Sequence, residues 1–365
     1  MRRVSAYGPG RVELLGNHTD YNLGLVLAAA IDRGVTVSGH TRSDGTIRLE
    51  SKTLDRVCES SVDILARDDK EPWANYALGV TRELLRAGYA VAGYDATIES
   101  DLALGGGLSS SAGFEVAIAC FLVKLYGFEI ELRDIARLCC CAENEFVGVA
   151  SGLLDQLTSL LGRADHALYI DCASHEVRTV PFPADLSLVI ANTGAQRRLV
   201  QSNYNQRREE CIAAAAALGV GNLRAVSLPH LECARGAIDD VLFRRALHVV
   251  GENDRVARAV DYLVSGEKAK FGALMNASHE SSRSNFENST PELDLLVEIA
   301  RSLPGVFGAR LTGGGFGGSI VTLVKSAEAA AIADHLARYY LVRTGREAGA
   351  FVCRLADGAA IGNAL

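Results

Sequence analysis

The 365-residue sequence has no apolar run that approaches the roughly 18 to 20 residues needed for a membrane-spanning helix. Its N-terminus carries two arginines but no apolar segment of signal-peptide length. We therefore expect a cytoplasmic protein with no membrane partner.

Basic tracts and paired cysteine motifs are also missing. The chain has 37 Lys and Arg against 44 Asp and Glu, and these charges are spread along its length, so we expect no nucleic-acid partner. There are nine cysteines but no CxxC pair, and Cys139, Cys140 and Cys141 are consecutive. This pattern disfavours a structural zinc site and indicates reduced cysteines that serve as small apolar side chains.

No internal repeat or low-complexity linker interrupts the sequence, and its length favours two domains. Strand-like runs lie at residues 24–31, 34–40, 46–51 and 94–100. Helical spacing of apolar residues begins at Phe114. These patterns predict a mixed sheet with helices in the first domain.

The character of the chain changes near residues 180–190. A strand-like run at 189–194 is followed by a long helical stretch. Two further strand-like runs, 306–312 and 319–325, flank a glycine cluster and precede a helical pattern at 329–341. We therefore predict a domain boundary near 180–190 and a second α+β domain.

The segment GRVELLGNHTDYN, at residues 10–22, gathers an arginine, a histidine, acids and amides beside an apolar run. A capped turn explains Asn17, Thr19 or Asn22 singly. It does not explain the whole cluster, so this segment indicates more than a turn.

The segment GGGLSSSAG, at residues 105–113, opens the helix that contains Phe114. Glycines let backbone N–H groups approach an anion, serine hydroxyls add donors or a metal ligand, and a helix N-terminus attracts phosphate. No GK[ST] follows, so this is not a Walker A loop. The pattern indicates a phosphate loop, and a simple glycine-rich turn is the alternative.

The segment TGGGFGGS, at residues 312–319, contains the pattern GxGxxG. A strand-like run rather than a helix follows it, which disfavours dinucleotide binding. A bare hairpin and a backbone that presses on another loop or a ligand both remain open. Glu143 and Asp155 lie on helical patterns elsewhere, where each acid alone is typical of a solvated helix face.

These segments, GRVELLGNHTDYNLGLVLAAAIDRG, LALGGGLSSSAG and LTGGGFGGSIVTLV, resemble the three signature motifs of the GHMP small-molecule kinases. The first is similar to the galactokinase signature, and EPWANYALGV, AENEFVGVASGLLDQ and RRLVQSNYNQRREEC are also galactokinase-like. The resemblance implies an α+β, two-domain GHMP kinase fold. Its mixed-sheet N-terminal domain would span 1–185, its ferredoxin-like C-terminal domain 186–365, and the active site would lie between them.

The resemblance also implies a reaction, in which the 1-hydroxyl of a sugar attacks the γ-phosphate of ATP. Asp155 falls where the family has the acid that accepts the hydroxyl proton, and Arg11 falls where it has a charge stabiliser. Phosphoryl transfer depends mostly on positioning and electrostatic stabilisation, so a base near the nucleophile and a cation near the phosphate make physical sense.

Nucleotide-binding residues follow from the same resemblance. The matching phosphate loop comprises Gly105, Gly106, Gly107, Leu108, Ser109, Ser110 and Ser111. Ser111 and Glu143 fall at positions that ligate Mg2+ in similar kinases, and a hydroxyl with a carboxylate suits this hard ion. Trp73 and Tyr76 match aromatic residues near the adenine, although core packing explains such a pair equally well.

Five residues fall where the family contacts its sugar: Asn17, His18, Asp20, Gly152 and Tyr204. Asn17 replaces a glutamate that contacts the sugar 6-position in galactokinases, and Ala103 replaces a proline before the phosphate loop. We expect a galacto-configured substrate, with galacturonate, N-acetylgalactosamine or L-arabinose as alternatives. A silent sugar sensor is the non-enzyme alternative, but the serine loop that is damaged in such proteins is intact here.

Overall fold

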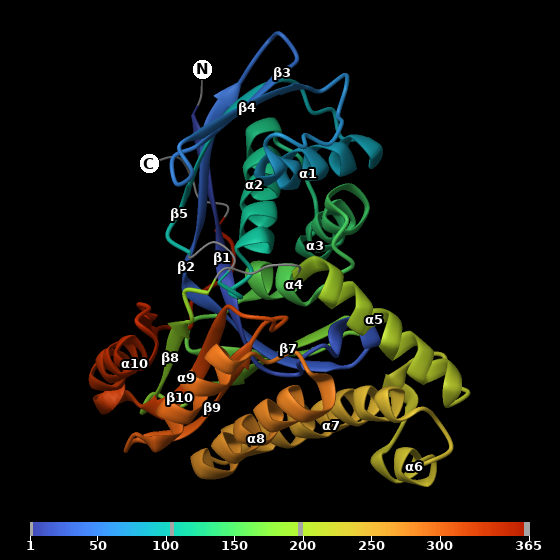
Figure 1. The fold of residues 1–365 in the computed structure, drawn as a ribbon. Helices are drawn as coiled ribbons and strands as arrows, with labels where there is room; N and C mark the ends of the chain where they lie inside the picture. Colours follow the sequence, from blue (N-terminus) through green and yellow to red (C-terminus); the bar gives the residue numbers. More distant parts are fainter. Residues whose placement is uncertain (1–2, 103–105, 196–199, 361–365) are drawn as a thin grey trace.

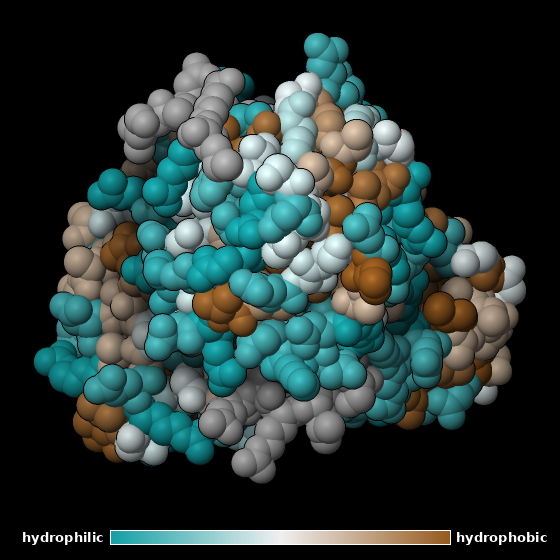
Figure 2. Space-filling model, turned by 90° about the horizontal axis from the view of Figure 1, so that it is seen from above, coloured by the Kyte–Doolittle hydropathy of each residue, from teal (hydrophilic) through white to brown (hydrophobic). Residues whose placement is uncertain are grey.

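The protein contains two β-sheets with helices packed on them (Figure 1). The computed structural model describes residues 3–102, 106–195 and 200–360. No helix in these ranges combines the length and the apolar character that crossing a membrane requires. The face shown in Figure 2 is mainly hydrophilic, with apolar patches separated by polar residues, as on an ordinary globular surface.

The first sheet has seven strands in the order β4-β3-β5-β2-β6-β7, with β1 also paired to β2. They are β1 (Val4–Leu15), β2 (Leu25–Thr41), β3 (Thr46–Ser51), β4 (Arg56–Ser61), β5 (Tyr94–Ser100), β6 (His166–Asp171) and β7 (Glu176–Pro181). Strands β3 and β5 pair in parallel, and the other described pairings are antiparallel. The predicted mixed sheet is confirmed, and the runs at 24–31 and 34–40 form one strand, β2.

Four helices pack beside this sheet (Figure 1): α1 (Asn75–Arg86), α2 (Ser110–Tyr126), α3 (Leu132–Cys141) and α4 (Leu154–Leu161). Helix α2 packs on β1 at two glycines, since a Cβ on Gly8 would lie 2.1 Å from the carbonyl oxygen of Gly113. Only glycine permits this approach. The helix begins at Ser110, earlier than Phe114, because the loop serines already belong to its first turn.

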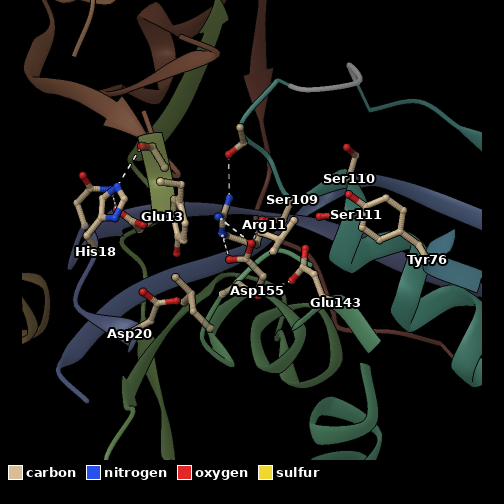
Figure 3. Close-up of a pocket in the computed structure, with 17 residues that line it drawn as sticks. Arg11, Glu13, His18, Asp20, Tyr76, Ser109, Ser110, Ser111, Glu143 and Asp155 are labelled. Carbon is tan, nitrogen blue, oxygen red and sulfur yellow. Dashed lines mark hydrogen bonds and ion pairs between the residues drawn. The ribbon is translucent and has the colours of Figure 1, made fainter. Parts of the chain in front are cut away.

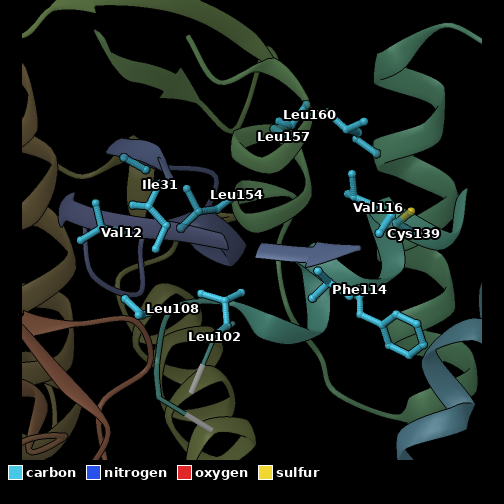
Figure 4. Close-up of a cluster of buried hydrophobic side chains, with 14 of the residues drawn as sticks. Val12, Ile31, Leu102, Leu108, Phe114, Val116, Cys139, Leu154, Leu157 and Leu160 are labelled. Atoms are coloured by element: carbon cyan, nitrogen blue, oxygen red, sulfur yellow. The ribbon is translucent and has the colours of Figure 1, made fainter. Parts of the chain in front are cut away.

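The core of this part fixes the helix that carries Asp155. Figure 4 shows Leu154, Leu157 and Leu160 of α4 among the apolar side chains of β1, β2, α2 and α3. All three leucines are buried, and each such side chain stabilises the fold by roughly 1.5–3 kcal/mol. Helix α3 continues into a π-helical segment, Ala142–Val147, which carries Glu143.

The second sheet has the order β11-β8-β10-β9. Its strands are β8 (Leu186–Asn192), β9 (Val306–Thr312), β10 (Ser319–Lys325) and β11 (Gly349–Cys353), and all described pairings are antiparallel. Helices α9 (Pro291–Ser302) and α10 (Ala329–Thr344) bury apolar residues against it. This strand order, fourth-first-third-second along the chain, is ferredoxin-like, as predicted.

A helical layer joins the two sheets (Figure 1). It consists of α5 (Val200–Ala217), α6 (Leu228–Cys233), α7 (Asp240–Val264) and α8 (Lys268–Ser281). Helix α7 packs on β2 and α8 packs on β9. Short helical segments complete the described fold: η1 (Asp20–Asn22), η2 (Pro72–Ala74), η4 (Leu223–Ala225), η5 (Ser282–Phe286) and η6 (Ser326–Glu328).

We propose that the domains divide at 1–185 and 186–365, because β7 ends at Pro181 and β8 opens the second sheet at Leu186. The C-terminal residues nevertheless return to the first sheet. Leu355 bridges to Ile31, and Ala360 bridges to Tyr7. Each domain therefore includes the strands of one sheet, and the end of the chain fastens the second domain to the first.

Candidate active site

A cavity of about 370 Å³ lies where β1, the starts of α2 and α4, and the glycine turn between β9 and β10 meet (Figure 3). The predicted residues that line it are Arg11, Asn17, His18, Asp20, Tyr76, Gly107, Ser109, Ser110, Ser111, Glu143, Asp155 and Tyr204. Gly314 of the glycine turn lines it as well. The fold thus brings residues of all three sequence motifs to one cavity.

Arg11 and Asp155 form a two-pronged ion pair inside this cavity. Arg11 Nε donates to Asp155 Oδ1 at 2.7 Å, and Nη2 donates to Oδ2 at 3.1 Å. Arg11 Nη1 donates to the carbonyl oxygen of Gly107 at 2.8 Å. Ser109 Oγ donates a further short hydrogen bond to Asp155 Oδ2. Strand β1, helix α4 and the serine loop therefore fix one carboxylate together, and paired geometry of this kind is both strong and specific.

The serine loop is held in place by the third motif. A Cβ on Gly313 would lie 2.6 Å from the carbonyl oxygen of Gly107, and Ser319 Oγ donates to the carbonyl oxygen of Gly106 at 2.5 Å. The glycine cluster is therefore not a bare hairpin but a backbone that presses on another loop. Leu108 is buried, and its carbonyl oxygen accepts from the backbone N–H of Arg11 at 3.1 Å. Gly105 and Ala103 lie outside the described residues.

Glu143 and Ser111 lie together on the other side of Asp155. Oε2 of the Glu143 carboxylate accepts from Ser151 Oγ at 2.6 Å and from Gln156 Nε2 at 3.0 Å, and Ser111 lies close enough to help lower the pKa of that carboxyl. Burial raises the pKa of Glu143, whereas these hydrogen bonds oppose the shift. The π-helical segment thus places the Glu143 carboxylate near the Ser111 hydroxyl, so that two hard oxygen ligands lie in one part of the cavity.

Trp73 lies beside a second cavity, of about 230 Å³, that shares Tyr76, Ser110 and Ser111 with the first. Its ring stacks on Phe114 with centroids 6.4 Å apart, and its Nε1 donates to Glu71. Trp73 does not line the larger cavity. Trp73 and Tyr76 therefore pack on the edge of the core and also border an apolar cavity next to the serine loop.

Asp20, which lies on the same side of Asp155 as His18 (Figure 3), contacts the backbone of Gly152. Asp20 Oδ2 accepts from the backbone N–H of Gly152 at 3.1 Å, and a Cβ on Gly152 would lie 2.5 Å from that oxygen. Gly152 therefore supplies an N–H at a place where a side chain would collide. Burial, assisted by the negative charge of Asp155, raises the pKa of Asp20 to about 7.

His18 is surrounded by aromatic rings, including Tyr204 of α5, whose ring centroid lies 5.0 Å away. Its Nε2 contacts the carbonyl oxygen of Gly314 at 3.0 Å, and its Nδ1 contacts the hydroxyl of Tyr21 at 2.7 Å. Burial lowers the pKa of His18 to about 4, so the ring is neutral at physiological pH. His18 thus contacts both helix α5 and the glycine turn between β9 and β10.

Asn17 is fully buried, although it lines the cavity. Its Nδ2 donates to Glu13 Oε1 at 3.1 Å and to the carbonyl oxygen of Gly313 at 2.8 Å. Its Oδ1 accepts from Asn288 Nδ2 at 2.9 Å. Both amide hydrogens of Asn17 are therefore used by the protein itself.

Three polar residues outside the predicted set also belong to the site: Glu13 and Ser151 line the cavity, and Gln156 holds the carboxylate of Glu143. The first had a usable signal, because Glu13 follows Arg11 by two positions in a strand and so shares its face. No local sequence pattern marks Ser151 or Gln156, because both bond to Glu143, which lies on a different helical segment.

Family models match three parts of the chain: the GHMP kinases N-terminal domain at residues 75–163, the GHMP kinases C-terminal domain at 259–341, and the galactokinase galactose-binding signature at 2–41. The galactokinase of Roseiflexus sp. (strain RS-1) is 43% identical over 97% of this chain and 92% of its own length. This chain belongs to the galactokinase family of GHMP kinases. The galactokinase of Mannheimia succiniciproducens, which is 40% identical over 97% of this chain and 94% of its own, agrees.

Solved structures agree with this family. The crystal structure of Lactococcus lactis galactokinase complexed with galactose has a TM-score of 0.94 and 33% identity, over 99% of this chain and 95% of that chain. Methanococcus jannaschii mevalonate kinase has a TM-score of 0.68 and 19% identity, over 98% of each chain, which shows the fold alone. The predicted two-domain GHMP fold is confirmed, and the protein is an enzyme of the sugar kinase type.

Proposed function

We propose that the protein transfers the γ-phosphoryl group of ATP to the 1-hydroxyl of galactose. The observation that carries this proposal is the two-pronged Arg11–Asp155 pair, which lies in a cavity beside a serine loop at a helix N-terminus. Phosphoryl transfer needs a carboxylate near the attacking hydroxyl and positive charge near the phosphate. Similarity to galactokinases, including one solved with galactose, supports galactose as the sugar.

Asp155 keeps acceptor capacity for the substrate. Its Oδ2 accepts from both Arg11 and Ser109, whereas Oδ1 accepts only from Arg11 Nε among the described residues. A carboxylate oxygen has two lone pairs, so Oδ1 has one for the attacking hydroxyl. Arg11 then keeps the carboxylate in place while its own charge lies near the reacting centre.

The residues at the other end of the cavity fit ATP with Mg2+. Ser111 and Glu143 supply a hydroxyl and a carboxylate, the hard oxygen donors that Mg2+ prefers together with phosphate oxygens and water. Bound Mg2+ would neutralise the charge of the phosphates. Ser151 and Gln156 hold the Glu143 carboxylate in one orientation. The apolar cavity beside Trp73 suits the adenine, and the N–H groups in the first turn of α2 suit the phosphates.

A panel of ATP-consumption assays tests the proposal. Galactose, galacturonate, N-acetylgalactosamine, L-arabinose and mevalonate are each supplied with ATP and Mg2+. We expect galactose to give the highest kcat/KM. Absence of turnover with galactose, or a higher kcat/KM for another member of the panel, would overturn the assignment.

A further inference from the structure

Glu13 is an acid of the cavity to which the reaction described above gives no role. It lies on β1 two residues after Arg11, so both side chains are on the face of the strand that borders the cavity. Glu13 is 3% exposed. In Figure 3 it lies with His18 and Asp20 on one side of the Arg11–Asp155 pair, while Ser110, Ser111 and Tyr76 lie on the opposite side.

Hydrogen bonds hold the backbone N–H of Glu13 and one of its two carboxylate oxygens in place. Its backbone N–H donates to Thr312 Oγ1 at 2.9 Å, and its Oε1 accepts from Asn17 Nδ2 at 3.1 Å and Arg310 Nη1 at 3.0 Å. Its Oε2 makes no hydrogen bond with any described residue, and it is not among the enclosed polar atoms without a partner. Glu13 is thus anchored through one carboxylate oxygen and has the other available to a ligand in the cavity.

The ion pair with Arg310 keeps the Glu13 carboxyl group ionised. This arginine of β9 is completely buried, and Glu13 is its ion-pair partner among the described residues. Burial raises the pKa of Glu13, and the guanidinium groups of Arg310 and Arg11 oppose that shift. Because arginine keeps its proton in proteins and an unpaired buried charge is costly, the pair is stable only as carboxylate and guanidinium.

Asn17 completes the arrangement. Because both of its amide hydrogens are given to Glu13 and Gly313, Asn17 orients the neighbouring carboxylate instead of offering a hydrogen to the substrate. Galactokinases have a glutamate at the position of Asn17. In this protein the carboxylate of Glu13 lies beside Asn17 and can take the place of that glutamate.

We propose that Glu13 binds, through Oε2, a sugar hydroxyl remote from the reacting one, on C4 or C6, and that Asn17 is its positioning residue. This inference rests on the proposed sugar 1-kinase activity. It also predicts the choice between galactose and galacturonate, because a substrate carboxylate at this end would face the negative charge of Glu13.

The test measures kcat/KM for galactose and its 2-deoxy, 4-deoxy and 6-deoxy analogues, in the wild type and in Glu13→Gln. We expect the substitution to lower kcat/KM for galactose roughly tenfold to hundredfold, the range for a hydrogen bond to a charged group. For either the 4-deoxy or the 6-deoxy analogue, the substitution should lower kcat/KM much less, because that analogue already lacks the hydroxyl that Glu13 binds. An equal loss on all four sugars, or protection of the 2-deoxy analogue alone, would overturn the inference.

Two further variants guard against a trivial loss of structure. Glu13→Asp keeps the charge beside Arg310 but withdraws the carboxylate by one methylene, so it should show the same selective loss. Glu252→Gln removes another buried acid, one that accepts the backbone N–H of Asn17 but does not line the cavity. It should lower kcat/KM for all four sugars by the same factor. An unselective effect of Glu13→Asp, or a hydroxyl-selective effect of Glu252→Gln, would contradict the role of Glu13.

Exchange of the two side chains tests Asn17. Asn17→Glu alone places two carboxylates within hydrogen-bond distance, so we expect a lower kcat/KM for galactose. The double variant Glu13→Asn with Asn17→Glu restores one carboxylate and one amide and should exceed both single variants. If Asn17→Glu alone improves galactose use, Asn17 does not serve Glu13. A wild type that is inactive on galactose would refute the proposed function, whereas these outcomes in an active enzyme refute only this inference.

Discussion

The two ends of the cavity are built in opposite ways. At the sugar end, Asn17 and Thr19 are fully buried, and their polar side-chain atoms bond to other parts of the protein. At the nucleotide end, Ser109, Ser110 and Ser111 are only half-buried, on a loop with glycines. The sugar end is a fixed wall, which suits discrimination between hydroxyl patterns. The nucleotide end offers partly exposed hydroxyls and the N–H groups of a helix N-terminus, which suit a phosphate group.

The charges at the two ends differ as well. Glu13 faces Arg310 at the sugar end, so its charge is compensated without a ligand. Asp155 and Glu143 lie at the middle and the nucleotide end, where Arg11 alone is ion-paired with an acid of the cavity among the described residues. Excess negative charge there suits a site that is completed by a cation arriving with ATP. Substitutions at the junction, at the nucleotide end and at the sugar end should therefore affect different measured quantities.

The largest effect should come from the junction of the two ends. Asp155→Asn keeps the shape of the side chain but removes the charge that faces the attacking hydroxyl. Turnover should fall at least about a hundredfold, the low end for loss of a general base, while ATP binding measured by calorimetry is retained. Asp134→Asn, an exposed acid in the first turn of α3, is the matched control and should leave turnover unchanged. Near-normal turnover of Asp155→Asn would remove that residue from the reaction.

Glu143→Gln should act on the nucleotide end alone. It removes the charged oxygen proposed as a Mg2+ ligand, so the Mg2+ concentration for half-maximal rate should rise about tenfold or more, since changes in the outer shell already cost that much. Glu115→Gln is the matched control, because Glu115 shares the Gln156 amide but is farther inside. Burial raises the pKa of Glu115 well above its ordinary value, so glutamine mimics its protonated form. Equal Mg2+ titrations for Glu143→Gln and the wild type would exclude Glu143 as a ligand.

Trp73→Leu should have a smaller effect at the same end. Loss of the ring beside the apolar cavity should raise the KM for ATP by about two- to tenfold, equivalent to about 0.5–1.5 kcal/mol. The KM for the sugar should not change. Trp73→Phe retains an aromatic ring and should lie between the leucine variant and the wild type. If Trp73→Leu lowers stability but leaves the KM for ATP unchanged, Trp73 is a core residue only.

The smallest effect concerns stability at the sugar end. The pKa of Asp20 is raised from the ordinary value of about 4 to about 7, so the folded protein without ligand loses stability as the pH rises from about 4 to about 7. Asp20→Asn removes that cost. Its melting temperature relative to the wild type should therefore be higher at pH 8 than at pH 5, by a few degrees at most. A pH-independent shift of the melting temperature for Asp20→Asn would refute the raised pKa.

Elements with a strong local pattern could be predicted from the sequence closely. The bounds of β3, β5, β9 and β10 are the predicted ones, because regular apolar patterns and turn residues mark each of them locally. Most predicted site residues line the cavity for a similar reason, since each motif contains its own turn chemistry.

Features that depend on distant parts of the chain could not be predicted. Glu13 and Arg310 are 297 residues apart, and no local pattern shows that they form a pair. The sequence shows only the position of Asn17 in its motif, whereas its distant partners Gly313 and Asn288 decide what its amide does. The π-helical segment that aims Glu143 follows an ordinary helical pattern without interruption.

Phosphorus NMR of the product tests the central claim most directly. The wild-type protein is incubated with ATP, Mg2+ and galactose, and the new phosphate resonance is assigned through its coupling to the sugar protons. We predict a single phosphomonoester coupled to the proton on C1, formed in step with ADP. A phosphate coupled to the protons on C6, or ADP formed without any sugar phosphate, would contradict a sugar 1-kinase.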